Sequence, residues 1–329
     1  MKRGSINLLY EIKTLYHIWN FFNTEKPEIV HLVTIKPYLY GGLISRLTKV
    51  PCLVTAISGL GTLFIGKNFK SKILRKLLYP IFKFAFNHSN QTVITQNKDD
   101  LNVLVDWGVL KKSKVRIIKG SGVNLNNFTN FKEKVGITTV CLASRLLRDK
   151  GIYEYVEAAK ILKARGIKAK FKLAGDLDIG NPTSLNKHEL NKIKKNRCVE
   201  ILGYVKDIPS LYENSHIICL PSYREGLPKG LLEAAAASRA IVTTDVPGCR
   251  DSIIPNKTGL LVPVNNSEKL ANALQILIEN PKNRIAMGKA GRLFAEKEFS
   301  IEKIVNSHIE IYSKLVKKIS FIKRKSSSF

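Results

Sequence analysis

HIICLPSYREGLPKGLLEA (216–234) joins an apolar strand pattern, a short turn and the start of a helix. The run HIICL has the continuous apolar character of a strand that is buried on both faces. In the turn, Gly226 frees the backbone and Pro228 suits a first helical position. A buried strand that turns directly into a helix is the repeating unit of a parallel α/β sheet. The stretch therefore predicts an α/β fold.

The same alternation of strands and helices runs through the rest of the chain. An amphipathic helix over 5–24 precedes a first set of strand patterns at 28–34, 51–57, 91–96 and 115–120. After a polar, Asn-rich stretch at 123–136, a second set follows at 137–144, 169–175, 199–203, 216–222, 240–245 and 259–263. We predict two Rossmann-like, doubly wound domains over 1–130 and 131–300, followed by a C-terminal helix and basic tail over 301–329.

The composition limits the partners. The 54 Lys and Arg against 26 Asp and Glu give a net charge of +28, which favours nucleic acid, an anionic membrane or phosphorylated substrates. No helix-turn-helix pattern or basic run interleaved with stacking aromatics is present, so nucleic acid is not expected. The five cysteines form no C-x-x-C pair, which fits a reducing compartment. Without a signal peptide or a long uncharged apolar run, we expect a cytoplasmic protein.

Charged residues follow two of the predicted strands. Glu225 and Glu233 flank the turn after 216–222, where carboxylates and backbone N–H groups together suit sugar hydroxyls. Arg145 and Lys150 follow the strand 137–144, and two cations beside a helix N-terminus suit a diphosphate. Both patterns have plainer explanations, because acidic residues stabilise helix N-termini and basic loops are common in so basic a chain.

Asp176 and Asp178 lie in a third loop, GDLDIGNP (175–182). Such a pair can hold Mg²⁺ or Mn²⁺ against a diphosphate, but it is also typical of an Asp/Gly/Asn/Pro turn. The cations of the other loop make a metal redundant. We therefore expect neither a metal nor another cofactor.

Residues 69–88 form a basic amphipathic stretch, in which Lys and Arg alternate with Ile, Leu and Phe. This pattern is typical of a helix that lies in a membrane interface. The alternative is a helix that covers the sheet with its Lys side solvated. Farther upstream, His31 is expected to end the strand 28–34 and to point toward a cleft between the domains.

Taken together, the motifs resemble the retaining, nucleotide-sugar-dependent glycosyltransferases of the GT-B fold, in the large family numbered 4. The spacing Glu225-x7-Glu233 is similar to that family's E-x7-E signature, and SRLLRDKG (144–151) to its diphosphate-binding loop. GDLDIGNPTSL, GYVKDIPSLY and LPSYREGLP resemble the bacterial subset that builds capsule, O-antigen and other lipid-linked glycans. The resemblance implies two Rossmann-like domains facing a cleft.

The resemblance also implies a reaction. It moves a sugar from a nucleotide-sugar donor, expected to be UDP-linked and in some members N-acetylated, to a lipid-linked saccharide at the inner face of the cytoplasmic membrane. Retention is explained by attack on the same face, with the leaving phosphate accepting the proton, so that neither an enzyme nucleophile nor a metal is needed. The implied donor site has six residues: Arg145, Lys150 and Glu225 in catalysis, and Gly226, Leu227 and Glu233 in holding the donor.

The sequence departs from the family pattern at its start. Members begin with a strand and a Gly-rich loop, which would precede residue 5, so the first domain is expected to lack its leading β-α units. Many members also carry a His where Ser58 stands within ISGLG; Ser58 and His31 are the residues expected on the acceptor side. The alternatives are a truncated, inactive remnant and a non-enzymatic protein that binds anionic membranes or nucleic acid.

Overall fold

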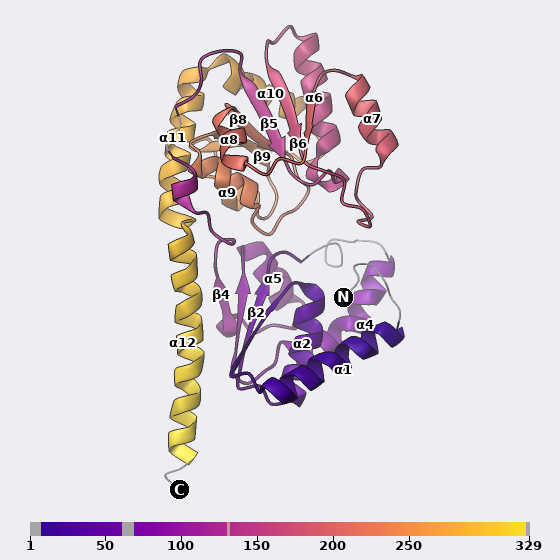
Figure 1. Ribbon diagram of the computed structural model, residues 1–329, viewed down its shortest axis with the longest axis vertical. Coiled ribbons are helices and arrows are strands. Elements are labelled where there is room, and N and C mark those ends of the chain that lie inside the picture. The colour runs from indigo at the N-terminus through magenta and orange to yellow at the C-terminus, as the bar shows by residue number, and fades with distance from the viewer. Residues whose placement is uncertain (1–7, 61–68, 130–131, 327–329) are drawn as a thin grey trace. The chain divides into compact units, whose positions relative to one another are not determined.

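A computed structural model describes residues 8–60, 69–129 and 132–326 of the chain. By its internal contacts the chain divides into two compact units, Met1–Gly120 with Ile304–Phe329 and Ser121–Lys303. Each unit is built on a parallel sheet with helices against its faces (Figure 1).

The first unit holds a four-stranded parallel sheet in the order β1-β2-β3-β4. The two central strands, β2 and β3, are largely buried, whereas β1 and β4 at the edges have exposed residues. Helices α2 and α4 bury Tyr38, Leu39 and Phe82 against one face of the sheet. In chain order the elements are α1 Leu8–Glu25, β1 Ile29–Val33, α2 Ile35–Leu47, β2 Cys52–Ile57, α4 Phe69–Ala85, β3 Gln91–Thr95, α5 Lys98–Asp106, η1 Lys112–Lys114 and β4 Val115–Ile117.

The second unit holds a six-stranded parallel sheet in the order β10-β9-β8-β5-β6-β7. Counted along the chain this is 3-2-1-4-5-6, the order of the doubly wound dinucleotide-binding fold. The order reverses between β5 and β8, and ligands of such sheets bind at the carboxyl ends of the strands at this point. The elements are η2 Leu125–Asn127, β5 Thr139–Ala143, η3 Arg148–Lys150, α6 Ile152–Ala164, β6 Lys170–Ala174, α7 Lys187–Lys195, β7 Glu200–Gly203, α8 Ile208–Glu213, β8 Ile217–Leu220, α9 Lys229–Ala236, β9 Ala240–Thr244, η4 Arg250–Ser252, β10 Gly259–Val262, α10 Ser267–Glu279 and α11 Pro281–Glu298.

The last helix, α12 (Ile301–Ser326), starts in the second unit and continues in the first. Its residues Ile304, Ile311 and Leu315 are buried in one cluster with Cys52, Val54 and Ile94 of the four-stranded sheet. The side-chain amide of Asn90 also donates a hydrogen bond to the carbonyl oxygen of Leu315, at 3.1 Å. Most of the segment that we predicted as a separate helix and tail therefore belongs to the first unit.

Candidate functional site

The loops that follow β5 and β8 are locked together at the point where the strand order reverses. Gly151 has a φ of +73°, and a Cβ at this position would overlap the carbonyl group of Pro221. The carbonyl oxygen of Asp149 accepts hydrogen bonds from the backbone N–H of Tyr223, at 2.8 Å, and from the hydroxyl of Ser222, at 3.1 Å. The two stretches singled out in the sequence therefore form one surface.

Lys150 and Glu225 form an ion pair across these loops. Lys150 ends the short helix η3, and Glu225 lies between β8 and α9. Their side chains are only 16% and 12% exposed, so the attraction between them is less screened than that of a surface pair. Two of the three predicted catalytic side chains thus contact each other directly.

Arg145, the third, pairs with a residue of the loop after β6. Its Nη1 lies 2.5 Å from Oδ2 of Asp178, and that oxygen also accepts a hydrogen bond from Asn181, at 3.1 Å. Gly175, with a φ of +141°, allows the close approach of the two loops, because a Cβ there would overlap the carbonyl oxygen of Ser144. Asp178, considered above as a metal ligand, is therefore a partner of Arg145.

No group of three or more His, Cys, Asp or Glu side chains is placed to hold a metal ion within residues 8–60, 69–129 and 132–326. The expectation that the reaction needs no metal stays a prediction.

A cavity of about 320 Å³ opens beside these loops, at the ends of β5 and β6. Arg145, Asp178, Tyr204, Gly230 and Glu233 are among the residues that line it. Helix α9 begins there without a side-chain cap at Pro228; the N–H of Leu231 donates to the Pro228 carbonyl oxygen, at 3.0 Å, and the N–H groups of Lys229 and Gly230 before it are suited to an anion. The cavity joins a guanidinium, a helix N-terminus and a carboxylate within one site.

Glu233 reaches this cavity from the second turn of α9, as the predicted spacing requires. Its side chain is 14% exposed, and one of its oxygens lies 3.4 Å from the ammonium of Lys229. Burial raises the pKa of the Glu233 carboxyl, and Lys229 partly opposes this shift. Tyr204, which also lines this cavity, is 74% exposed; it belongs to the motif GYVKDIPSLY but was not among the predicted site residues.

Gly226 and Leu227 lie in the turn that leads into α9. The backbone N–H of Glu225 donates to the carbonyl oxygen of Pro247, at 3.2 Å, which fixes the start of the turn. The side chain of Leu227 is buried in the apolar core below the turn. Leu227 could therefore contact a ligand through its backbone amide and not through its side chain.

His31 does not end a strand, and the prediction that it does is wrong. It lies in the middle of β1, because the ladder with β2 continues through Leu32 and Val33. Its Nδ1 lies 2.7 Å from the hydroxyl of Tyr312 on α12, and its ring lies beside that of His308. Ser58, in contrast, is exposed directly after the carboxyl end of β2.

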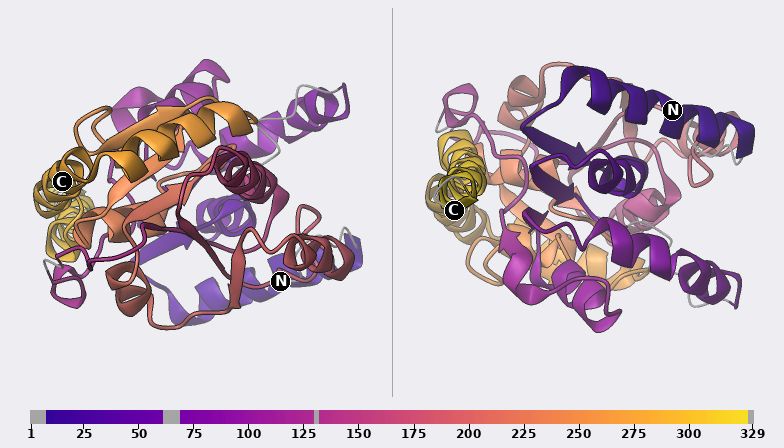
Figure 2. Two further views of the ribbon diagram at one scale, coloured as in Figure 1. Left: turned by 90° about the horizontal axis from the view of Figure 1, so that it is seen from above. Right: turned by 90° about the horizontal axis from the view of Figure 1, so that it is seen from below.

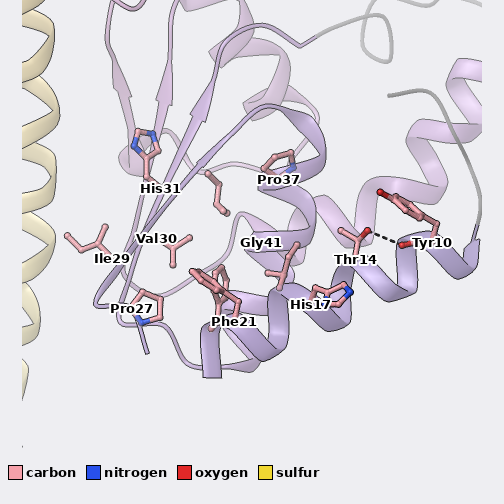
Figure 3. Close-up of a pocket in the computed structure, with 13 residues that line it drawn as sticks. Tyr10, Thr14, His17, Phe21, Pro27, Ile29, Val30, His31, Pro37 and Gly41 are labelled. Carbon is pink, nitrogen blue, oxygen red and sulfur yellow. Dashed lines mark hydrogen bonds between the residues drawn. The ribbon is translucent and has the colours of Figure 1, made fainter. Parts of the chain in front are cut away.

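His31 also lines a second cavity, of about 710 Å³, between α1 and the edge strand β1 (Figure 3). In Figure 3, His17 and Phe21 approach from α1, while Ile29 and Val30 lie on the strand. None of the residues that line this cavity is a Lys, Arg, Asp or Glu. It therefore lacks the groups that would hold a diphosphate, and the cavity at β5 and β6 is the better candidate for an anionic ligand.

The two parallel sheets define the class of α/β proteins with two Rossmann-like domains, and comparison with known families gives the family. The family model "Glycosyl transferases group 1" matches residues 126–294, more than half of the chain, and a second model, "Glycosyl transferase 4-like", matches residues 2–97. The chain belongs to the group 1 glycosyltransferase family.

Curated relatives cover nearly the whole chain. An N,N'-diacetylbacillosaminyl-diphospho-undecaprenol α-1,3-N-acetylgalactosaminyltransferase of Campylobacter jejuni is 28% identical over 96% of this chain and 85% of its own length. The capsular polysaccharide biosynthesis glycosyltransferase CapM of Staphylococcus aureus is 26% identical over 96% of this chain and 84% of its own. These comparisons do not support the expectation that the first domain is truncated.

Solved structures confirm the GT-B fold. A sucrose-phosphate synthase from Thermosynechococcus elongatus superimposes with a TM-score of 0.80 at 20% identity, over 97% of this chain and 81% of that one. Anabaena Alr3699/HepE in complex with UDP-glucose gives a TM-score of 0.74 at 16% identity, over 93% of this chain and 81% of that one.

In the described part of the chain, none of the helices has the length and apolar character needed to cross a membrane.

Proposed function

We propose that the protein transfers a sugar from a UDP-sugar to an undecaprenyl-diphosphate-linked saccharide, with retention, during assembly of a surface polysaccharide. The observation that carries the donor half is the cavity that joins Arg145, the start of α9 and Glu233. The names of the relatives support the acceptor half of the proposal. The Campylobacter enzyme is named for a diphospho-undecaprenol acceptor, and an Escherichia coli relative, 26% identical over 92% of this chain, is named as a UDP-Gal:α-D-GlcNAc-diphosphoundecaprenol α-1,3-galactosyltransferase.

In this proposal the diphosphate of the donor lies against the first turn of α9 and the Arg145 guanidinium, with Lys150 at its other side. Glu233 accepts hydrogen bonds from the ribose. Glu225 and the amides of Gly226 and Leu227 hold the hydroxyls of the donor sugar. Arg145 pairs with Asp178, and Lys150 pairs with Glu225. The phosphates of the donor must therefore displace these carboxylates from the two cations when the donor binds.

The chemical step breaks the bond between the anomeric carbon and the phosphate oxygen, and forms a bond from that carbon to the acceptor hydroxyl oxygen on the same face. The hydroxyl proton goes to the departing phosphate. Negative charge develops on that phosphate, so the cations and the helix N-terminus stabilise the transition state more than the ground state. No residue needs to act as a nucleophile, and no metal is invoked.

The test is transfer of radiolabelled sugar from UDP-Glc, UDP-Gal, UDP-GlcNAc and UDP-GalNAc to undecaprenyl-diphosphate-linked saccharides, with binding of each donor followed by calorimetry. We expect Arg145→Ala and Glu225→Gln to lower kcat/KM about a hundredfold or more, the range measured for loss of one group that stabilises developing charge.

Arg148→Ala is the matched control, because Arg148 lies in the same loop but binds Glu189 of α7, with Nη2 2.8 Å from Oε2. This variant should keep full activity. Full transfer by Arg145→Ala and Glu225→Gln would overturn the assignment of the site. A folded wild-type protein that binds none of the four donors would favour the inactive or non-enzymatic alternatives.

A further inference from the structure

The first half of α4 exposes apolar side chains that a helix covering a sheet would bury. Phe69 is 77% exposed, Leu77 is 66% exposed, and Ile73 and Leu74 are each more than 40% exposed. Only the second half of the helix enters the core, where Phe82 and Ala85 are buried. Between the exposed apolar residues stand lysines and an arginine, and the helix contains no acidic residue.

Helix α1 carries a second exposed apolar surface. Its buried or half-buried residues, Leu15, Ile18 and Phe22, pack on the core of the first unit. On another side of the helix an exposed stripe follows the spacing 3-4-3 and consists of Leu9 (79% exposed), Ile12 (54%), Tyr16 (60%) and Trp19 (43%). The Tyr16 and Trp19 rings stack, with their centroids 6.1 Å apart. A stripe of this kind, with Tyr and Trp among its residues, matches the composition of membrane–water interfaces.

The helices that carry these two surfaces are both neighbours of α2. Figure 1 and both views of Figure 2 show the first turns of α1 and of α4 extending past the same side of the four-stranded sheet. We define the docking face as the stripe of α1 together with the exposed residues of α4 from Phe69 to Leu77 that the structure describes.

We propose that this docking face binds an anionic lipid bilayer, with the apolar side chains of α1 and α4 in the interface and the α4 cations against the lipid phosphates. The proposal rests on the proposed function, in which the donor site must come close to an acceptor that is anchored in a membrane. It adds α1 as half of the membrane contact and assigns the α4 cations a partner.

Charge decides between the occupants of this face. The α4 segment of the docking face has four Lys and Arg residues in its sequence and no acid, so a second copy of the chain would bring like charges together. An anionic bilayer satisfies both features at once, because its phosphates attract the cations and its acyl boundary takes up the apolar side chains. Nucleic acid would match the charge but not the aliphatic residues between the cations.

Trp19 provides a direct readout. The chain has two tryptophans, and Trp107 is half-buried, with its ring centroid 5.0 Å from that of Phe82. In Trp107→Phe, Trp19 is the only tryptophan, and its emission should shift to shorter wavelength on vesicles that contain phosphatidylglycerol. Brominated acyl chains should quench it. Vesicles of phosphatidylcholine alone should give neither effect. Trp19→Phe, which keeps Trp107, should show no shift.

Co-sedimentation of the unaltered protein and its variants with the same vesicles gives a second measurement. Leu77→Gln and Ile12→Gln should each weaken binding roughly tenfold through lost apolar burial. The matched controls are Leu293→Gln on α11 and Ile276→Gln on α10, whose side chains are 67% and 52% exposed, and these should bind as the wild type does.

The charge arm compares two triple variants of equal net charge. The first changes Lys72, Arg75 and Lys76 to Gln and should weaken binding about a hundredfold, since each cation near an anionic surface contributes about fivefold. The second changes Lys192, Lys194 and Lys195 on α7 to Gln and should leave vesicle binding unchanged. Loss of binding by both triple variants alike would overturn the proposal, because it would mean that only the overall charge matters.

Two further outcomes would overturn it. One is an unchanged Trp19 emission on anionic vesicles in a protein that still binds its UDP-sugar. This result would contradict the docking face and leave the proposed donor site standing. The other is self-association, measured by sedimentation, that Ile12→Gln abolishes.

Discussion

Gly151 and Gly166 have nearly the same backbone conformation, with φ angles of +73° and +75°, but different surroundings. A Cβ on Gly166 would meet no atom within 4 Å, whereas one on Gly151 would overlap the Pro221 carbonyl group. We expect Gly166→Ala to lower the free energy of unfolding by about 1–2 kcal/mol, the cost of a left-handed alanine.

Gly151→Ala should cost clearly more, and it should also weaken donor binding, because the loops that carry Lys150 and Glu225 must separate. Urea denaturation and calorimetry with UDP check both effects. Equal stability losses in the two variants would show that the close approach of the loops contributes nothing.

Among the elements of the first unit, β1 contacts α12 through His31, whose Nδ1 lies 2.7 Å from the Tyr312 hydroxyl. Burial lowers the pKa of His31, and nearby His308 adds to this shift. Below about pH 6.5 the His31 imidazole is therefore protonated more readily in the unfolded chain than in the folded chain. Stability is thus retained above this pH and lost as the pH falls through the lower, folded pKa.

We expect His31→Gln, which keeps a hydrogen-bonding partner for the Tyr312 hydroxyl, to reduce the loss of stability between pH 7 and pH 5. Denaturation at several pH values checks this expectation. His88, a buried histidine of the same unit, also has a lowered pKa and will leave a remaining pH dependence. An unchanged pH dependence in His31→Gln would contradict the role of His31.

At the scale of the whole molecule, all of the residues proposed to bind the donor lie in Ser121–Lys303. The core of that unit is complete within it, with strands β5, β8 and β9 buried among α6, α9 and α10. We therefore expect residues 121–303, expressed alone, to fold and to bind the UDP-sugar within about tenfold of the affinity of the full chain. Circular dichroism and calorimetry would test this. A folded fragment with no measurable affinity would show that the first unit contributes to the donor site.

Much of the candidate site could be predicted, because its parts occur as local patterns. Arg145, Lys150 and Glu225 follow buried strands, and parallel strands bring their carboxyl ends to one edge of a sheet. The failures also have physical reasons. His31 was placed at a strand end because an apolar run does not show where its ladder with β2 stops. The pairing of Asp178 with Arg145 could not be predicted either, because the sequence does not show that Gly175 brings their loops together.

The sequence by itself determined the fold class, the order of the elements and the loops that carry charge, since buried strands must be apolar and turns need Gly, Pro and Asn. The tertiary structure alone decided the pairing of Lys150 with Glu225 and of Arg145 with Asp178. It alone also showed that α1 has an exposed apolar stripe. Periodicity reports which residues share a side of a helix, but only packing determines which side another element covers.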